Sequence, residues 1–220
     1  MKFFAVNGSP RRKCNTAQLL DKSLEGVKSV FEDAETERID LYDFPFHGCV
    51  SCFACKRIGG KHYGHCAQKD DLKPILEKIT QADGVILGSP NYLNDVTGNM
   101  RNFLERFIFP FVSYSRTKTV EHKRMPIGFI YTMNASHDIA KQTGFLGYYD
   151  FFEGVMGSVF SEPEHLRVYE TYQFRDYSKY VSDAFDEKER KHIRKTRFPK
   201  DLESAFEMGR KIAIRAEQHD

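Results

Sequence analysis

The sequence predicts an α/β fold, a three-layer α/β/α sandwich around a five-stranded parallel sheet of order 2-1-3-4-5. Strand-like and helix-like segments alternate from Lys2 to Tyr169, which is typical of repeated βαβ units. The segment Gly84–Gly88 is continuously apolar, as expected for a strand that a parallel sheet buries on both faces. A chain of 220 residues suffices for one sizeable α/β domain and is short for two.

Short apolar runs predict five strands, at Lys2–Val6, Thr36–Leu41, Gly84–Gly88, Pro126–Tyr131 and His165–Tyr169. Apolar residues at helical spacing predict helices at Thr16–Phe31, from Asp70 or Asp71 to about Ala82, at Thr97–Phe107, at 138–158 and at Asp201–Glu217. Residues 171–199 break this rhythm, and there we expect Glu187–Arg197 to form a solvated helix face. We predict a single domain over 1–220, with a cysteine-rich loop at 43–68 and a C-terminal excursion plus helix at 171–220.

Composition excludes several classes of protein. The net charge of +2 does not indicate a nucleic-acid or membrane partner. The apolar N-terminal run is too short for a signal peptide, and no apolar stretch approaches transmembrane length. We therefore expect a cytoplasmic protein, in which clustered cysteines serve metal or redox chemistry rather than disulfides. His165, His192 and His219 are expected at the surface.

The segment Gly8–Thr16, with sequence GSPRRKCNT, joins the first strand to the first helix. Backbone N–H groups at a helix N-terminus form an anion site that the helix dipole favours. Ser9, Asn15 and Thr16 can donate to phosphate oxygens, and Arg11 adds positive charge. Neither of the glycine-rich nucleotide motifs GxxxxGK[ST] and GxGxxG is present. The segment predicts a phosphate-binding loop, and its alternative is an ordinary polar turn with a helix cap.

A second loop, residues 88–100, follows the third strand at the carboxyl end of the sheet, where open α/β sheets bind ligands. The side chain of Tyr92 could flank a flat ring, and backbone groups of Asn91 to Asn94 could meet its polar edge. The alternative is a connecting loop whose tyrosine packs on the surface.

Together, GSPRRKCNT and the later ADGVILGSPNYLNDVTGNMRNFLER resemble the NAD(P)H-dependent FMN reductase superfamily of flavodoxin-like proteins, over about residues 1–135. The resemblance implies that FMN is the cofactor and NAD(P)H the cosubstrate. It implies phosphate contacts from Ser9, Arg11, Asn15 and Thr16, and flavin contacts from Pro90, Asn91, Tyr92, Leu93 and Asn94. A third flavin loop should follow the fourth strand, with Thr132 and Asn134 as its contacts. The family often has Gly where this chain has Cys14 and Asn94.

Four of the five cysteines, Cys49, Cys52, Cys55 and Cys66, lie within 18 residues. Thiolates at such spacing suit an iron–sulfur cluster or zinc. The segment resembles the iron–sulfur flavoprotein branch of the same superfamily, which implies a [4Fe–4S] cluster on these four residues. Zinc, with His62 or His65 as a further ligand, and free thiols are the alternatives.

This cysteine loop follows the second strand, so we expect it at the carboxyl edge of the sheet, beside the flavin. Lys56, Arg57 and Lys61 are expected to lower the thiol pKa values.

The resulting hypothesis is an FMN-dependent oxidoreductase that passes electrons from NAD(P)H to a small-molecule or protein acceptor, with the cluster as a second redox centre. No side chain is required as catalytic acid or base, because the flavin carries the chemistry. One alternative is a non-enzymatic FMN and iron–sulfur electron carrier, and another is a thiol or zinc sensor without flavin. We also expect a homo-oligomer, a dimer or tetramer, with Tyr169–Tyr180 and Phe107–Phe111 at the interface.

Overall fold

The computed structural model describes residues 1–218, and His219 lies outside them. Its parallel strands are β1 (Lys2–Asn7), β2 (Glu35–Asp40), β3 (Gly84–Pro90), β4 (Ile127–Thr132) and β5 (Glu164–Val168). The order in the sheet is β2-β1-β3-β4-β5, so the predicted topology is confirmed. Central β3 and β4 are buried along almost their whole length, which explains why these segments are apolar without alternation.

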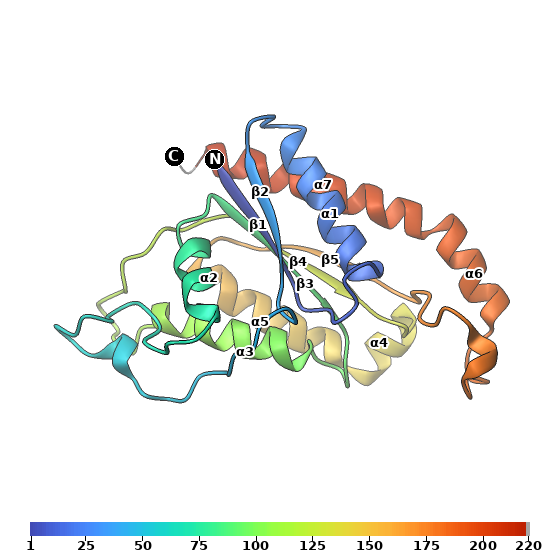
Figure 1. Ribbon diagram of the computed structural model, residues 1–220, viewed down its shortest axis with the longest axis horizontal. Coiled ribbons are helices and arrows are strands. Elements are labelled where there is room, and N and C mark those ends of the chain that lie inside the picture. The colour runs from blue at the N-terminus through green and yellow to red at the C-terminus, as the bar shows by residue number, and fades with distance from the viewer. Residues whose placement is uncertain (219–220) are drawn as a thin grey trace.

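The helices form a layer on each face of the sheet (Figure 1). On one face lie α1 (Asn15–Lys28) and α7 (Phe198–Glu217), preceded by α6 (Glu187–Thr196). On the other lie α2 (Leu72–Ile79), α3 (Gly98–Ile108) and α5 (Phe145–Val159), with α4 (His137–Thr143) just before α5. The short 3-10 helices within residues 1–218 are η1 (Ala54–Lys56), η2 (Phe109–Phe111) and η3 (Tyr177–Lys179).

Glycine lets α1 and α7 cross with their backbones in contact. A Cβ atom on Gly209 would lie 1.8 Å from the carbonyl oxygen of Ser23, and one on Gly26 would lie 2.0 Å from that of Phe206. No side chain fits at either position. This crossing fixes the C-terminal helix against α1, the helix that follows the predicted phosphate loop.

Two expectations about the helices are corrected. The single helix expected over 138–158 is interrupted at Gly144, which has a φ of +79° and separates α4 from α5. The face of α6 is not fully solvated, because Arg190 is buried and its Nη1 donates to the carboxylate of Glu170 (3.0 Å). Local charge patterning could not reveal a partner that lies 20 residues earlier.

The run Phe107–Phe111 does not supply the interface expected of it. Phe107, Ile108 and Phe111 are buried in the core of their own chain, beside Phe160. Separately, none of the helices within residues 1–218 combines the length and the apolar character needed to cross a membrane.

Candidate functional site

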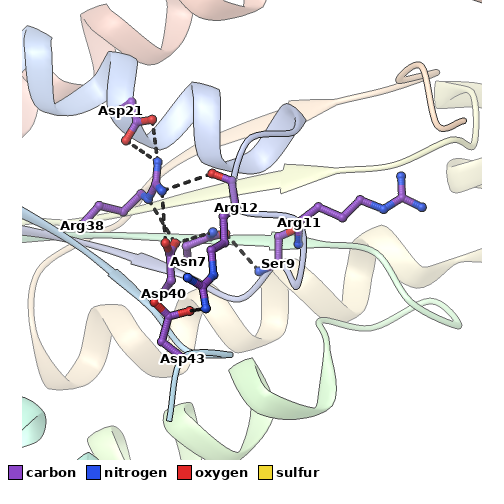
Figure 2. A network of polar contacts seen from close by, with 8 residues as sticks. All are labelled: Asn7, Ser9, Arg11, Arg12, Asp21, Arg38, Asp40 and Asp43. Carbon is purple, nitrogen blue, oxygen red and sulfur yellow. Dashed lines mark hydrogen bonds and ion pairs between the residues drawn. The ribbon is translucent and has the colours of Figure 1, made fainter. Parts of the chain in front are cut away.

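The predicted phosphate loop is held by a polar network that begins at the end of β1 (Figure 2). The buried Asn7 accepts a hydrogen bond at Oδ1 from the backbone N–H of Ser9 (3.0 Å). Its Nδ2 donates to Asp40 at the end of β2 (2.7 Å). The hydroxyl of Ser9 accepts in turn from the N–H of Arg11 (3.1 Å). The loop conformation is therefore set by side chains of two neighbouring strands.

Arg38 on β2 is the centre of this network. Its guanidinium donates to Asp40 (3.0 Å), to Asp21 on α1 (2.5 Å) and to the carbonyl oxygen of Arg12 (3.1 Å). Burial would lower the pKa of Arg38, but the hydrogen bond with Asp40 and the charge of Asp21 outweigh it and raise the pKa. The side chain of Arg11 projects away from the network (Figure 2).

The first and second loops are tied together where β1 and β3 end. The N–H of Gly8 donates to the carbonyl oxygen of Gly88 (2.8 Å), and a Cβ atom on Gly8 would lie 2.8 Å from the Cβ of Met100. The buried hydroxyl of Thr97, which caps α3, donates to the carbonyl oxygen of Gly8 (2.7 Å). Glycine is thus required at position 8 by the close approach of two loops.

The third loop joins the same group of contacts. The hydroxyls of Thr16 and Thr132 share a hydrogen bond (2.8 Å), and the N–H of Asn91 donates to the carbonyl oxygen of Thr132 (2.8 Å). Together the three loops and the segment 171–173 enclose a cavity of about 110 Å³. Nine of the eleven predicted flavin-site residues line it: Ser9, Arg11, Asn15, Thr16, Pro90, Asn91, Tyr92, Thr132 and Asn134. We call it the three-loop cavity.

One polar atom in this cavity lacks a partner. Asn134 Oδ1 is buried and accepts no hydrogen bond within the described residues 1–218. A buried acceptor without a donor is costly, and in native proteins it commonly marks a place where a ligand or water binds. The side-chain amide of Asn91, unlike that of Asn134, has a partner, because its Nδ2 donates to the hydroxyl of Tyr149 (2.7 Å).

The structure places the remaining two predicted residues, Leu93 and Asn94, outside the three-loop cavity. They form a tight turn between Tyr92 and Asp95, whose backbones pair with each other. Their φ angles are +53° and +66°, and the Leu93 side chain is fully exposed. The left-handed φ of Asn94 fits a position where relatives often have Gly, whereas the φ of Cys14, −99°, needs no glycine.

The C-terminal excursion lies against the phosphate loop. Arg11 Nη1 donates to the carbonyl oxygen of Gln173 (2.5 Å), and Asn15 Nδ2 donates to that of Tyr172 (3.1 Å). Two predicted phosphate ligands therefore hold backbone carbonyl oxygens in this structure. These contacts narrow the three-loop cavity.

Glu170, with a φ of +55°, anchors the start of the excursion. Its carboxylate accepts from Arg190 (3.0 Å) and Arg197 (2.8 Å). Burial would raise the pKa of Glu170, but the hydrogen bonds from both arginines outweigh it and lower the pKa. No local pattern in the sequence indicated this clasp, which holds α6 and the start of α7 to the end of β5.

The cysteine loop is placed differently from the sequence expectation. It does not stay at the carboxyl edge of the sheet but runs along the C-terminal half of α3 (Figure 1). There the backbone N–H of Cys49 donates to Glu105 (3.0 Å), and the ring of Phe53 contacts that of Phe109 (6.1 Å between centroids). The loop therefore lies beside α3, away from the three-loop cavity.

The four loop thiols nevertheless line one small cavity, of about 20 Å³. His62 and His65 do not line it. Ser51 and Phe53 both have left-handed φ angles, +52° and +54°, between the first three cysteines. Such strain in non-glycine residues is typical of functional loops. Within residues 1–218, however, no three His, Cys, Asp or Glu side chains are arranged to hold a metal ion.

Arg106 on α3 joins both ends of the cysteine loop. Its fully buried guanidinium donates to the carbonyl oxygen of His47 (3.0 Å), to Cys66 Sγ (3.4 Å) and to both carboxylate oxygens of Asp70 (2.8 Å for Nη2 to Oδ1). The hydrogen bonds from Arg106 lower the pKa of Asp70.

The cationic side chains near the thiols do not lower the pKa of Cys55 as expected. Burial raises the pKa of the Cys55 thiol and outweighs the ammonium of Lys56. The expected lowering by Lys56, Arg57 and Lys61 is therefore wrong for this thiol. Lys56 itself donates to the carbonyl oxygens of Phe109, Pro110 (3.0 Å) and Val112 (2.5 Å). Its ammonium group therefore binds the carbonyl oxygens that follow the C-terminus of α3.

The profile of the NADPH-dependent FMN reductase family matches residues 1–144. An iron–sulfur flavoprotein of Archaeoglobus fulgidus is 40% identical over 106 residues, 48% of this chain and 48% of that protein. The chain thus spans about half the length of the curated relatives it matches.

Among solved structures, an NAD(P)H:quinone oxidoreductase from Methanothermobacter marburgensis superimposes with a TM-score of 0.70 at 14% identity, covering 96% of this chain and 98% of that one. A flavodoxin from the domain Archaea superimposes with a TM-score of 0.52 at 13% identity, covering 99% of both chains. The family resemblance and the flavodoxin-like fold predicted from the sequence are confirmed.

Proposed function

The chain belongs to the NADPH-dependent FMN reductase family, and from this premise we propose that it binds FMN in the three-loop cavity and oxidises NAD(P)H. The observation that carries the proposal is the convergence of three separate loops on one cavity whose lining includes Asn134, with a buried Oδ1 that has no hydrogen-bond partner within residues 1–218. An acceptor at this position suits a flat heterocycle that presents an N–H group. The hydroxyls of the first loop and the charge of Arg11, which line the same cavity, suit a phosphate.

Each loop has a distinct task in this proposal. Ser9, Asn15 and Thr16 donate hydrogen bonds to the phosphate, and Arg11 pairs with its charge. Pro90, Asn91 and Tyr92 border the ring on one side, with Thr132 and Asn134 on the other. When bound, FMN supplies the hydride acceptor and releases electrons to the second substrate, so the protein need only orient it and exclude water.

The three-loop cavity must enlarge before FMN can bind in it. Its volume of about 110 Å³ is below the roughly 300–1,000 Å³ of ordinary ligand pockets. Arg11 and Asn15 hold the carbonyl oxygens of Gln173 and Tyr172 against the loop, and phosphate oxygens are stronger acceptors for the same donors. We therefore expect FMN binding to displace the segment 171–173.

Stopped-flow reduction tests the enzymatic proposal against an electron carrier. The enzyme predicts that excess NADPH or NADH bleaches the absorbance of protein-bound FMN within seconds. A carrier predicts no bleaching by either nucleotide and rapid bleaching by a reduced low-potential protein donor. The second result would contradict the enzymatic proposal and favour the alternative.

We propose further that the cysteine loop holds an iron–sulfur cluster. The donor set fits, because four thiols line one cavity and the cationic Arg106 donates to one of them. The curated relatives named iron–sulfur flavoprotein support the assignment. The present cavity is too small for a cluster, so ligation requires the loop 49–66 to open around it.

After anaerobic reconstitution with iron and sulfide, we expect about four irons per chain. Cys52→Ala should lose that iron and keep FMN, because Cys52 lies away from the three-loop cavity. Cys14→Ala, which removes the one cysteine outside the loop, should keep the iron and is the matched control. Iron near zero in the wild type would reject the cluster, and one zinc per chain would support the alternative site.

We propose that the protein self-associates into a dimer or tetramer. The cysteine loop lies along α3, away from the three-loop cavity of the same chain, so a second copy is the simplest way to bring a cluster close to a flavin. Exposed apolar side chains stand beside both features, including Val50 and Phe53 near the cysteines and Leu93 at the second loop. Light scattering at micromolar concentration should report at least twice the mass of one chain, and a monomer that retains FMN would contradict this proposal.

A further inference from the structure

A second, larger cavity of about 750 Å³ lies between the phosphate loop and the C-terminal excursion. Residues 11–15 and Gln18 form one wall. Residues 172–176, Lys179 and Tyr180 form the opposite wall, and Arg194 on α6 completes the lining. Its volume is within the usual range for ligand pockets. The sequence suggested only a subunit interface for Tyr169–Tyr180. The proposed function uses Arg11 and Asn15 of this lining and leaves the groups contributed by residues 172–180 and by Arg194 without a role.

The charge of this cavity is strongly positive. Six cationic side chains line it: Arg11, Arg12, Lys13, Arg175, Lys179 and Arg194. Within residues 1–218, only Arg12 and Lys179 among them lie in an ion pair, with Asp43 (2.5 Å) and Asp176 (3.6 Å). The other four have no carboxylate partner in that part of the chain. Unpaired cations around a concave surface attract anions strongly.

Arg194 shows that the positive charge is held in place. Its guanidinium donates to the amide oxygens of Asn15 (2.8 Å) and Gln18 (2.7 Å) and stacks on the ring of Phe198 (3.7 Å from the centroid). These neutral partners fix its orientation without cancelling its charge. Burial without a counter-ion lowers the pKa of Arg194, so a bound anion would be strongly favoured beside it.

The opposite wall offers aromatic surface. The rings of Phe174 and Tyr180 are stacked, with centroids 4.3 Å apart, and both line the cavity together with Tyr172. Tyr180 is 55% exposed, so part of its ring is accessible beside the cations of the cavity. Cations combined with exposed ring faces suit a phosphorylated nucleoside rather than a simple inorganic anion.

The two cavities adjoin, because Arg11, Cys14, Asn15 and Gln173 line both of them. The hydrogen bonds from Arg11 and Asn15 to the carbonyl oxygens of Gln173 and Tyr172 lie at this boundary, so the displacement of residues 171–173 expected on FMN binding would let one extended ligand reach from the large cavity to the flavin loops. A ligand that reduces FMN must place its reactive end in the three-loop cavity. The rest of that ligand then extends past the phosphate loop into the large cavity, with its cations and aromatic rings.

We propose that the large cavity binds the 2′-phosphoadenosine end of NADPH, and that Arg175, Lys179 and Arg194 select NADPH over NADH by binding the 2′-phosphate. This inference rests on the proposed function for the reaction, but the binding site itself can be tested without flavin. Adenine stacks on the Phe174–Tyr180 wall, while the guanidinium and ammonium groups meet the phosphate.

Calorimetry with 2′,5′-ADP and 5′-AMP tests the site directly, because only the first carries the 2′-phosphate. We expect 2′,5′-ADP to bind at least about tenfold more tightly than 5′-AMP, since each charge-assisted hydrogen bond to phosphate contributes at least that factor. The double variant Arg175→Ala/Lys179→Ala should lose most of this difference. In steady-state assays the same variant should raise the KM for NADPH at least about tenfold and lower the preference for NADPH over NADH.

The double variant Lys188→Ala/Lys195→Ala is the matched control, because it removes two exposed cations of α6 that do not line the cavity. It should leave the affinity for 2′,5′-ADP unchanged within about twofold. Equal binding of 2′,5′-ADP and 5′-AMP by the wild type, or equal losses in both double variants, would overturn the proposal. A protein that holds no FMN yet prefers 2′,5′-ADP would contradict the proposed function and still support this site.

Discussion

Changing Ser9, Asn15 and Thr16 together to Ala will weaken FMN binding by at least about a thousandfold. Each substitution removes one donor to the phosphate, and hydrogen bonds to charged groups contribute about 1.5–3 kcal/mol each, so three amount to at least about 4 kcal/mol. Flavin absorbance or fluorescence titration of the purified variant measures the loss. FMN affinity equal to that of the wild type would reject this loop as the phosphate site.

The controls for this variant separate binding from folding. Thr16 also shares a hydrogen bond with Thr132, so urea unfolding without FMN must accompany the titration. Thr16→Ser keeps the hydroxyl and should keep most of the affinity. A matched triple variant, Ser29→Ala/Thr80→Ala/Ser204→Ala, removes three hydroxyls that donate to helix carbonyls elsewhere, and it should bind FMN as the wild type does.

Replacing Arg106 with Gln will lower the free energy of unfolding by about 3–5 kcal/mol, the usual cost of breaking a buried ion pair by removing one partner. The guanidinium is fully buried and satisfies acceptors on His47, Cys66 and Asp70, which a shorter amide cannot reach together. Urea denaturation at neutral pH measures the change. Arg57→Gln, which removes an exposed cation of the same loop, should cost little and is the control.

The same variant has a pH signature. Because Arg106 holds the pKa of Asp70 below its unfolded value, this carboxylate stabilises the fold above about pH 4 and loses that contribution as pH falls through the lowered folded pKa. The decrease in the free energy of unfolding on acidification should therefore be smaller in Arg106→Gln than in the wild type. A loss below about 1 kcal/mol, or an unchanged acid profile, would contradict the structural role assigned to Arg106.

The fold was predictable because its signals are local. Continuous apolar runs marked β3 and β4, and the loops predicted at 8–16 and 88–100 marked the ends of β1 and β3. In a parallel sheet these ends meet at one edge, so the loops of the predicted site had to converge. Nine of the eleven predicted residues line the resulting cavity for this reason.

What the sequence did not reveal depends on distant pairs. Arg106 and its acceptor Asp70 are separated by 36 residues, and the Asn7–Asp40 contact spans 33. No period or motif reports such partners. The side chain of Leu93 points outward because the residue lies in a left-handed turn. Apolar residues rarely adopt this conformation, so nothing in the sequence indicated the turn at Leu93. The path of the cysteine loop along α3 likewise follows from the Arg106 contacts rather than from the spacing of its cysteines.

FMN binding can be measured by titrating the purified, flavin-free protein with FMN. We expect saturation at one FMN per chain, with a Kd at or below about 1 μM and FAD at least about tenfold weaker, because the first loop closes around a terminal phosphate. Wild-type protein that shows no saturable change in flavin absorbance or fluorescence up to about 100 μM FMN would contradict this expectation.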